Sequence, residues 1–355
     1  MAKTTTGREI LMSSYGSIME MEIASTPAVF RNILAAMEQF DSIKNLLTEK
    51  KIRSILILAR GTSDNAAHFL KYLIEVKLGL PCGLTSPSAV TIYNASLHYE
   101  GALVIAISQS GQSPDLVAFA DSAKRSGAQV IAMTNDESSP LAQLAHHHLS
   151  LLAGPELAVA ATKSYSAQLL VSYLLVSSWT GTPVIGHEIV DQAEALVANA
   201  QINSAAIATS SRDSEMVFLG RGFSYANARE AALKVQETSK LSVQGLSTAD
   251  YQHGPISALR ESTQLFIVAP HRIPVHSISE ALVKIRNRVD HITWIGEGGT
   301  SVGTDIRIGG SRCSDEIASS IVDAISLQGF ALEFAKKFGF NPDSPEGLSK
   351  VTMTL

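Results

Sequence analysis

Three charged residues in the second half of the chain are spaced so that they can share one face of a helix. Glu230, Lys234 and Glu237 stand at positions i, i+4 and i+7 of the segment Arg229–Glu237. A carboxylate tuned by a nearby ammonium can transfer protons as a general acid or base. The same spacing also occurs on solvated helix faces that carry a single ion pair, so the spacing alone leaves both interpretations open.

Two isolated residues downstream could join that chemistry. His253 stands before a Gly-Pro turn, where an imidazole can act in acid/base catalysis or simply bond to a backbone carbonyl. Lys350 is an amine nucleophile if it is buried against a carbonyl substrate, and an ordinary solvated lysine otherwise. The run His146–His148 has no carboxylate or cysteine at metal-ligand spacing, and we expect a helix-to-strand junction there instead of a metal site.

A hydroxyl-rich turn, Ser108–Ser113, suits a phosphate group. It follows the apolar run Ala102–Ile107, which predicts a buried strand, and it precedes Pro114 and the segment Leu116–Lys124, which has helical periodicity. Backbone N–H groups, hydroxyls and the positive end of that helix then point to one place. The turn is neither a Walker loop nor a GxGxxG motif, and the alternative is a serine-rich turn that only caps its helix.

The elements that must position these residues alternate between strand and helix, which predicts an α/β fold with a parallel, doubly wound sheet. We expect a helix over residues 65–78, after the turn Arg60–Asp64. A helical region interrupted at Pro27 is expected over residues 10–40, where its role is packing or dimer contact. The expected strands of this half are Ser54–Ala59, Cys82–Thr85, the strand that contains Leu103–Ile107, and Gln129–Thr134.

The second half of the chain repeats the first. At one constant spacing, the aligned pairs are Ser54–Ser63 with Glu215–Ser224, Leu103–Ile107 with Gln264–Val268, and Val130–Met133 with His291–Trp294. Three strands in one register predict two copies of one αβα module, with a boundary in the stretch 179–213. In the second copy Ala269–Arg272 replaces the serine-rich turn, so we expect only the first copy to bind the anion.

The composition excludes several classes of protein. With 355 residues, of which 45% are hydrophobic and 17% charged, the chain is long enough for two domains of ordinary size. A net charge of −5 without a run of Lys or Arg predicts neither a nucleic-acid nor an anionic-membrane partner. The two cysteines form no disulfide framework, no signal-peptide core follows Met1, and no apolar stretch reaches the length of a membrane span. We therefore expect a cytoplasmic protein.

Six motifs together resemble the tandem sugar-isomerase (SIS) modules of the glucosamine-6-phosphate synthase family, and the segment Met19–Pro27 resembles the entry to its isomerase half. The motifs are Gly61–Ser63, Ser108–Gly111, Gly154–Lys163, Glu230–Glu237, His253–Pro255 and Leu348–Lys350. The resemblance covers nearly the whole chain and implies two tandem SIS modules, each a parallel, doubly wound αβα sandwich. The implied parts are a helical arm (1–45), a phosphate-binding module (46–190), a second module (205–338) and a tail that closes over the active site (339–355).

The resemblance also implies an activity. The synthases carry an amino-terminal glutaminase domain with a terminal cysteine nucleophile, whereas here Met1-Ala2 leads directly into the isomerase part and Cys82 is internal, so the site is expected to release ammonia. The residues of several motifs are most similar to those of SIS-type glucosamine-6-phosphate deaminases. These enzymes convert glucosamine 6-phosphate and water to fructose 6-phosphate and ammonia. The alternatives are a fructosamine-6-phosphate deglycase, a deaminase of another amino-sugar phosphate, and a non-catalytic sugar-phosphate sensor.

Finally, the resemblance implies roles for single residues. Glu237 moves a proton between carbons 2 and 1, Lys350 forms a Schiff base or polarises the carbonyl, and Glu230 and Lys234 position and tune Glu237. His253 opens the sugar ring from the partner subunit, which implies a homodimer. The implied phosphate and sugar ligands are Gly61, Thr62, Ser63, Ser108, Gln109, Ser110, Ser113, Ala160 and Ser349. No metal or organic cofactor is implied. Arg60, Ser113 and Ala161 depart from the synthase pattern, and the hydroxyl missing at Ala161 bears on sugar specificity.

Overall fold

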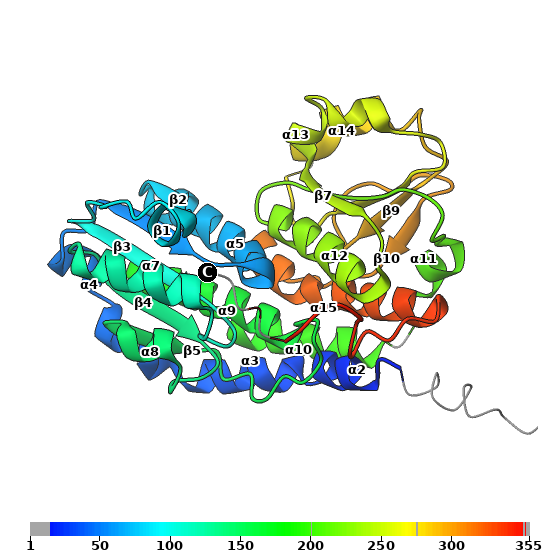
Figure 1. Cartoon of the computed structure of the whole chain (residues 1–355). Coiled ribbons are helices and arrows are strands. Elements are labelled where there is room, and N and C mark those ends of the chain that lie inside the picture. The colour runs from blue at the N-terminus through cyan, green and yellow to red at the C-terminus, as the bar shows by residue number, and fades with distance from the viewer. Residues whose placement is uncertain (1–14, 200, 275, 351, 353–355) are drawn as a thin grey trace, which may run out of the picture. The chain divides into compact units, whose positions relative to one another are not determined.

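The computed structural model describes residues 15–199, 201–274, 276–350 and 352. Its helices and strands carry the labels of Figure 1. The first part of the chain contains α2 (Ser17–Ala24), α3 (Thr26–Ala35), η1 (Met37–Ile43), α4 (Leu46–Glu49), β1 (Ser54–Leu58), α5 (Gly61–Leu78), β2 (Cys82–Leu84), α6 (Ser88–Thr91), β3 (Ala102–Ile107), α7 (Pro114–Arg125), β4 (Gln129–Thr134), α8 (Pro140–Leu144), β5 (His147–Ser150) and α9 (Lys163–Thr180). The remainder contains α10 (Gly186–Ala198), α11 (Ser204–Thr209), β6 (Met216–Gly220), α12 (Ser224–Ser239), β7 (Val243–Ser247), α13 (Thr248–Tyr251), η2 (Pro255–Ala258), β8 (Gln264–Val268), α14 (His276–Ile285), β9 (Ile292–Ile295), β10 (Ile306–Ile308) and α15 (Glu316–Lys337).

These elements form two compact units, and each is described by itself. Of the described residues, the first unit holds 15–25, the loop Glu156–Thr162 and those of the segment Asp191–Lys350. The second unit holds Thr26–Pro155 and Lys163–Val190. The loop Glu156–Thr162 therefore belongs to the first unit, although the chain on both sides of it belongs to the second.

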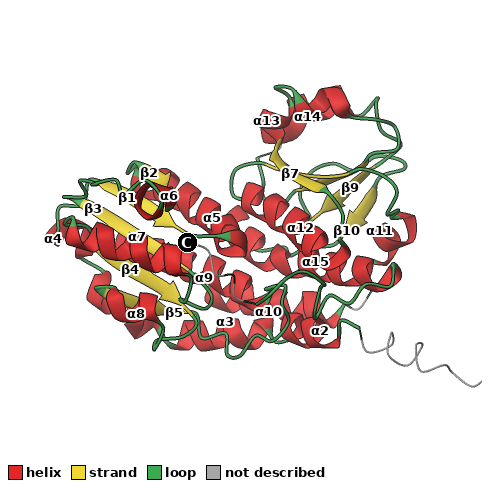
Figure 2. Ribbon diagram, in the orientation of Figure 1, coloured by secondary structure: helices red, strands yellow, loops and turns green. Residues whose placement is uncertain are grey.

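Five parallel strands form the sheet of the second unit, in the order β2-β1-β3-β4-β5 (Figure 2). β1 pairs with β3, and Leu58 stands opposite Ala106. α5 connects β1 to β2 on one side of it in the sheet, whereas α7 connects β3 to β4 on the other side. Because such crossovers are right-handed, the two helices lie on opposite faces of the sheet. The order reverses between β1 and β3, so the loops after these strands border the crevice where doubly wound sheets bind ligands.

The sheet of the first unit has the same topology. Its strand order is β10-β9-β8-β6-β7. Read from the opposite edge, this order is β7-β6-β8-β9-β10, which matches β2-β1-β3-β4-β5 strand for strand. α15 packs on α12 as α9 packs on α5. The predicted α/β fold with two copies of one doubly wound module is confirmed. Two strands that the sequence did not predict, β7 and β10, lie at sheet edges, where a strand needs less apolar sequence than in the centre. The edge strand β5 is the strand of the helix-to-strand junction expected at His146–His148.

Alternate residues of β6 face opposite sides of the first unit's sheet. Met216 and Phe218 pack with α12 and α15, while Val217 and Leu219 pack with residues of α14. On the first of these faces the ring of Phe218 stacks on that of Phe266, with centroids 4.5 Å apart. Because both faces are buried, the strand reads as a continuous apolar run rather than as an alternating pattern.

Two element boundaries differ from the sequence prediction. α5 begins at Gly61, so Gly61–Ser63 form its first turn instead of a separate loop. The break in the amino-terminal helical region falls at Ser25, and Pro27 lies in the first turn of α3, where a backbone N–H has no helical partner to lose. The predicted part of this region before residue 15 lies outside the described residues.

In the described part of the chain, one helix meets the length and composition of a membrane span. This helix is α15, and 89% of its most apolar window is buried inside the fold. It packs against α12 and α2 of its own unit, as a core helix does. The sequence prediction that no stretch reaches this length and apolarity is wrong for α15.

Candidate active site

The predicted phosphate-binding turn lies in the second unit, directly after β3. Oγ of Ser108 accepts the N–H of Gly111 at 3.1 Å, and Oγ of Ser110 accepts the N–H of Gln112 at 3.3 Å. The turn leads into the N-terminus of α7, and α5 begins in the same way directly after β1, the neighbouring parallel strand. The N-termini of α5 and α7 thus lie at one edge of the sheet, where their backbone N–H groups favour an anion.

Gly111 is required by the shape of this turn. Its φ is +63°, in the left-handed region that side chains disfavour. A Cβ atom at this position would lie 2.2 Å from Oγ of Ser139, the residue that caps α8. The turn is therefore packed directly on the start of α8.

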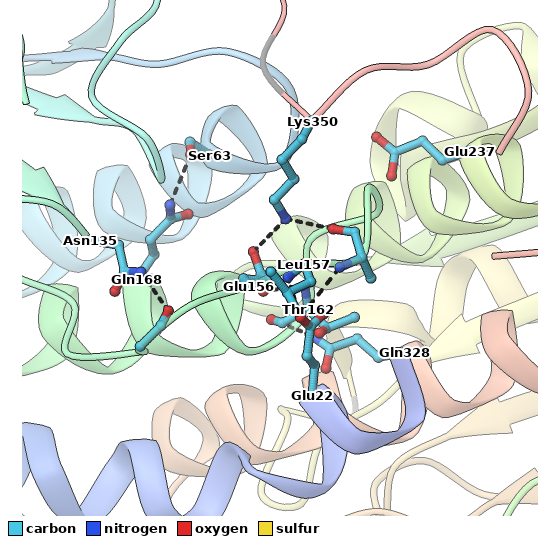
Figure 3. Close-up of polar contacts among 12 residues, drawn as sticks. Glu22, Ser63, Asn135, Glu156, Leu157, Thr162, Gln168, Glu237, Gln328 and Lys350 are labelled. Atoms are coloured by element: carbon cyan, nitrogen blue, oxygen red, sulfur yellow. Dashed lines mark hydrogen bonds and ion pairs between the residues drawn. The ribbon is translucent and has the colours of Figure 1, made fainter. Parts of the chain in front are cut away.

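Arg60 links the two loops that border the crevice. Its Nε donates to Oδ2 of Asp115 at 2.9 Å, which ties the end of β1 to the first turn of α7. Asp115 is buried, whereas the side chain of Arg60 is 51% exposed. From the other side, Gln168 of α9 donates to Oγ of Ser63 at 2.9 Å (Figure 3). Ser63 is thus held by the scaffold, and Arg60 brings positive charge to the edge where the anion would bind.

The three charged residues predicted to share a helix face do so on α12, in the first unit. Nζ of Lys234 lies 3.5 Å from Oε1 of Glu230 and also donates to Oε2 of Glu237. Glu230 and Lys234 are buried, so the interpretation as a solvated face is wrong for them. Burial opposes the charged form of Lys234, but the charges of Glu230 and Glu237 outweigh it and raise its pKa. A permanent ammonium therefore stands between a buried carboxylate and a partly exposed one.

The loop Glu156–Thr162 binds Lys350 of the same unit. Nζ of Lys350 donates to Oε2 of Glu156 at 3.0 Å and to the carbonyl oxygen of Ala158 at 2.6 Å (Figure 3). The other carboxylate oxygen of Glu156 accepts the N–H of Thr162 at 2.9 Å. Gln328 of α15 donates to the carbonyl oxygen of Thr162 at 2.9 Å, so the loop is anchored to the core of the unit. Lys350 is thus a partly buried lysine with defined partners, not a solvated one.

Residues of α2 and of the carboxyl-terminal segment also form hydrogen bonds with the loop Glu156–Thr162. Oε1 of Glu22 accepts the N–H groups of Leu157 and Ala158. The N–H of Val159 donates to the carbonyl oxygen of Asp343 at 3.1 Å, and the Asp343 carboxylate accepts the N–H of Met19 at 2.8 Å in α2. Sequence reasoning missed Glu22. Its only sequence signal was the resemblance of Met19–Pro27 to the family, which does not reveal that this carboxylate is buried.

The remaining predicted site residues lie outside this cluster or contribute only backbone. His253 lies in an exposed turn between α13 and η2, and among the described residues its ring forms no hydrogen bond or ion pair. Ser349 is exposed, and Ala160 is buried within the loop that binds Lys350. The run His146–His148 spans the junction of α8 and β5, where Nδ1 of His146 accepts the N–H of Val130 at 3.0 Å.

The two groups of predicted residues therefore divide between the units. The first unit contains the ionisable residues Glu230, Lys234, Glu237 and Lys350. The second unit contains the hydroxyl-rich turn Ser108–Ser113, called the anion turn below. The first group can move protons and present an amine, and the second can bind a phosphate. This pairing of chemistries is the one expected of an enzyme that acts on a phosphorylated sugar.

Sequence comparison supports that interpretation at the level of the family. The profile of the SIS domain matches residues 46–178 and 210–302, which together cover more than half of the chain. The chain belongs to the SIS domain family. The two matched ranges begin shortly before β1 and shortly before β6, which is the corresponding strand of the other sheet, in agreement with the repeated topology.

Relatives of this SIS protein include isomerising enzymes. The glutamine–fructose-6-phosphate aminotransferase (isomerizing) of Methanothermobacter thermautotrophicus is 31% identical over 350 residues, which cover 95% of this chain and 57% of that protein. The chain thus spans little more than half the length of the curated relatives it matches.

Solved structures agree with this relationship. A candidate phosphosugar isomerase from Silicibacter pomeroyi superposes with a TM-score of 0.80 at 29% identity, covering 92% of this chain and 99% of that one. The C-terminal domain of glucosamine-fructose-6-phosphate aminotransferase from Francisella tularensis superposes with a TM-score of 0.78 at 25% identity, covering 94% of this chain and 99% of that domain. The resemblance to the isomerase part of the synthase is therefore confirmed.

Proposed function

We propose that this SIS protein is an enzyme that isomerises and deaminates an amino-sugar phosphate, most specifically glucosamine 6-phosphate, to fructose 6-phosphate and ammonia. The observation that carries the proposal is the α12 cluster, where Glu237 is partly exposed and bonded to the buried ammonium of Lys234. A carboxylate held in this way is suited to remove and return a proton at carbon. The anion turn of the second unit supplies the second requirement, a place for the phosphate.

The proposed reaction begins with the open-chain sugar, which carries an aldehyde at carbon 1 and an amine at carbon 2. Glu237 removes the proton from carbon 2 and returns it to carbon 1, while the amine nitrogen gives up one proton and the carbonyl oxygen gains one. These transfers leave a ketimine at carbon 2 and an alcohol at carbon 1. Water then hydrolyses the ketimine and ammonia leaves. His253 opens the pyranose ring from the partner subunit of a homodimer, which its exposed position in this chain permits. Lys350 acts on the carbonyl or imine carbon, and no metal or organic cofactor is required by these steps.

Ammonia release from glucosamine 6-phosphate, coupled to detection of fructose 6-phosphate, tests this function directly. Galactosamine 6-phosphate and a fructosamine 6-phosphate are assayed in parallel. Turnover of the first substrate supports the proposal. Turnover of the fructosamine alone would identify a deglycase, and binding without turnover of all three would identify a sugar-phosphate sensor.

A further inference from the structure

A cavity of about 190 Å³ lies within the first unit, lined by α2, α15, the end of α10 and the segment that follows α10. Its walls are mainly apolar, and their buried side chains include Ile23 of α2, Leu196 of α10, and Ile325 and Leu332 of α15. Pockets for drug-sized ligands measure roughly 300–1,000 Å³, so this cavity suits a smaller molecule with an apolar body. Among its described lining residues, none belongs to the α12 cluster or to the loop Glu156–Thr162.

One polar side chain in the wall of this cavity lacks a hydrogen-bond partner. Asn203 is only 6% exposed, yet its Oδ1 accepts no hydrogen bond from any described residue. The side chain does not cap α11, the helix that it precedes. Rotation about χ2 of asparagine is broad, so the amide can present either its oxygen or its nitrogen to the cavity. A buried amide without a partner costs stability, and a ligand that bonds to it removes this cost.

The mouth of the cavity carries carboxylates. Glu20 of α2 and Glu333 of α15 belong to the lining, and the described lining residues include no lysine or arginine. Lys336 lies outside the lining, with its Nζ 3.3 Å from one carboxylate oxygen of each. Negative charge is therefore in excess at the mouth, which disfavours an anion such as a sugar phosphate. The apolar walls disfavour any charged group, so the cavity fits an uncharged molecule.

The two helices in the cavity wall also carry anchors of the loop Glu156–Thr162 (Figure 3). Glu22, whose carboxylate accepts two N–H groups of the loop, directly precedes Ile23 of the wall. Gln328, which donates to a carbonyl oxygen of the loop, directly precedes Gly329 of the wall. A ligand that contacts α2 and α15 together therefore holds both anchors in place.

We propose that this cavity binds a small uncharged molecule with an apolar body and one carboxamide or hydroxyl group, which hydrogen-bonds to Asn203, and that binding stabilises the loop Glu156–Thr162. The apolar body lies against α2 and α15, and the polar group faces the amide. Because the loop binds Lys350, the ligand acts on the conformation of a predicted site residue without contacting it. The binding site does not depend on the proposed reaction.

Two probes of nearly equal shape test the hydrogen bond to Asn203. Benzamide carries a carboxamide, and acetophenone replaces its NH₂ group by a methyl group. Their dissociation constants for the full chain are measured by saturation-transfer NMR titration. We expect benzamide to bind roughly tenfold more tightly, the effect of one hydrogen bond, and Asn203→Leu to abolish this difference. Binding of neither probe, equal binding of both to wild type, or the same preference in Asn203→Leu would overturn the proposal.

A matched pair of substitutions tests where the probes bind. Ala24 and Ala205 are both exposed on helices of the first unit, but only Ala24 lines the cavity. We expect Ala24→Trp to block both probes, because the indole occupies the cavity, and Ala205→Trp to bind them as wild type does. Circular dichroism verifies the fold of both variants. Undiminished binding to folded Ala24→Trp would place the probes elsewhere and contradict the proposal.

Hydrogen–deuterium exchange tests the effect on the loop. Exchange of the backbone N–H groups of Glu156–Thr162 is followed by peptide mass spectrometry, with and without benzamide at ten times its Kd. If the loop opens only when the cavity is empty, exchange slows about tenfold, close to the factor 1 + [L]/Kd. Ala24→Trp is the control and should show no slowing when benzamide is added. Unchanged exchange of the loop in wild type saturated with benzamide would refute the proposed stabilisation.

Discussion

The ammonium of Lys234 donates to the carboxylate of Glu237 from within the core of its unit. The side chain of Lys234 is 1% exposed and that of Glu237 is 23% exposed, so the bond runs from the buried side of α12 to its accessible side. Glu230 fixes the same ammonium from one turn earlier in the helix. A positive charge behind an accessible carboxylate fixes the orientation of that carboxylate, as a group that transfers protons requires.

Replacement of Glu237 by Gln is expected to lower kcat for the amino-sugar phosphate by roughly 10²–10⁴-fold, because the amide cannot accept a proton from carbon. Binding of the sugar phosphate should persist, since the anion turn is untouched. Steady-state kinetics and calorimetric titration measure the two effects separately. Glu280→Gln, on the exposed face of α14, is the control. Full activity of Glu237→Gln would show that another residue is the base.

Replacement of Lys234 by Met removes the charge that contacts both carboxylates on this face of α12, and the buried Glu230 loses that contact. We expect a loss of about 3–5 kcal/mol in the free energy of unfolding at pH 7, measured by urea denaturation. The pKa of Lys234 is raised above its ordinary value of 10.5. The stabilisation is therefore fully present below pH 10.5 and is lost only as the pH rises through the folded-state pKa.

Lys240→Met is the matched control for that experiment. Its ammonium pairs with the exposed carboxylate of Glu346, and a pair of this kind contributes about 0–1 kcal/mol. Equal destabilisation by the two substitutions would contradict the importance of the buried cluster.

Replacement of Ser110 by Ala removes a hydroxyl of the anion turn that also accepts the N–H of Gln112. We expect KM for the sugar phosphate to rise roughly tenfold, which corresponds to one hydrogen bond of about 1.4 kcal/mol, with kcat changed little. Ser126→Ala, at the half-buried C-cap at the far end of α7, should leave both constants unchanged. A fall in kcat at unchanged KM would argue against a role in phosphate binding.

Asp323 makes stability depend on pH near neutrality. It is fully buried in α15, and burial raises its pKa from 3.8 to about 7 although Ser311 donates to it. A carboxyl group with a raised folded-state pKa contributes stability that is complete below pH 3.8 and is lost as the pH rises to about 7. The variant Asp323→Asn lacks this loss, so its free energy of unfolding relative to wild type should increase between pH 5 and pH 8 by on the order of 2–3 kcal/mol.

Urea denaturation at the two pH values measures this difference. The exposed Asp290 provides the control Asp290→Asn, which should show the same pH dependence as wild type. A constant difference between Asp323→Asn and wild type at both values would show that Asp323 does not titrate in this range.

The repeat, the parallel sheets and the charged face of α12 could be read from the sequence because each depends on local spacing. Central strands such as β3 and β4 are buried on both sides and therefore appear as apolar runs. Glu230, Lys234 and Glu237 meet because the helical period brings residues three and four apart together. The edge strands β7 and β10 were missed because they have no such run.

The sequence by itself thus determined the two modules, the serine-rich turn after β3 and the charged face of α12, all of which arise from neighbours along the chain. Only the tertiary structure decided which residues surround Lys350. Glu22 and Glu156 are far from it in sequence and far from each other, and no spacing rule predicts that both reach one loop. Nor does residue type reveal that Glu156 is buried, and it is burial that makes its charge costly and ties it to the lysine.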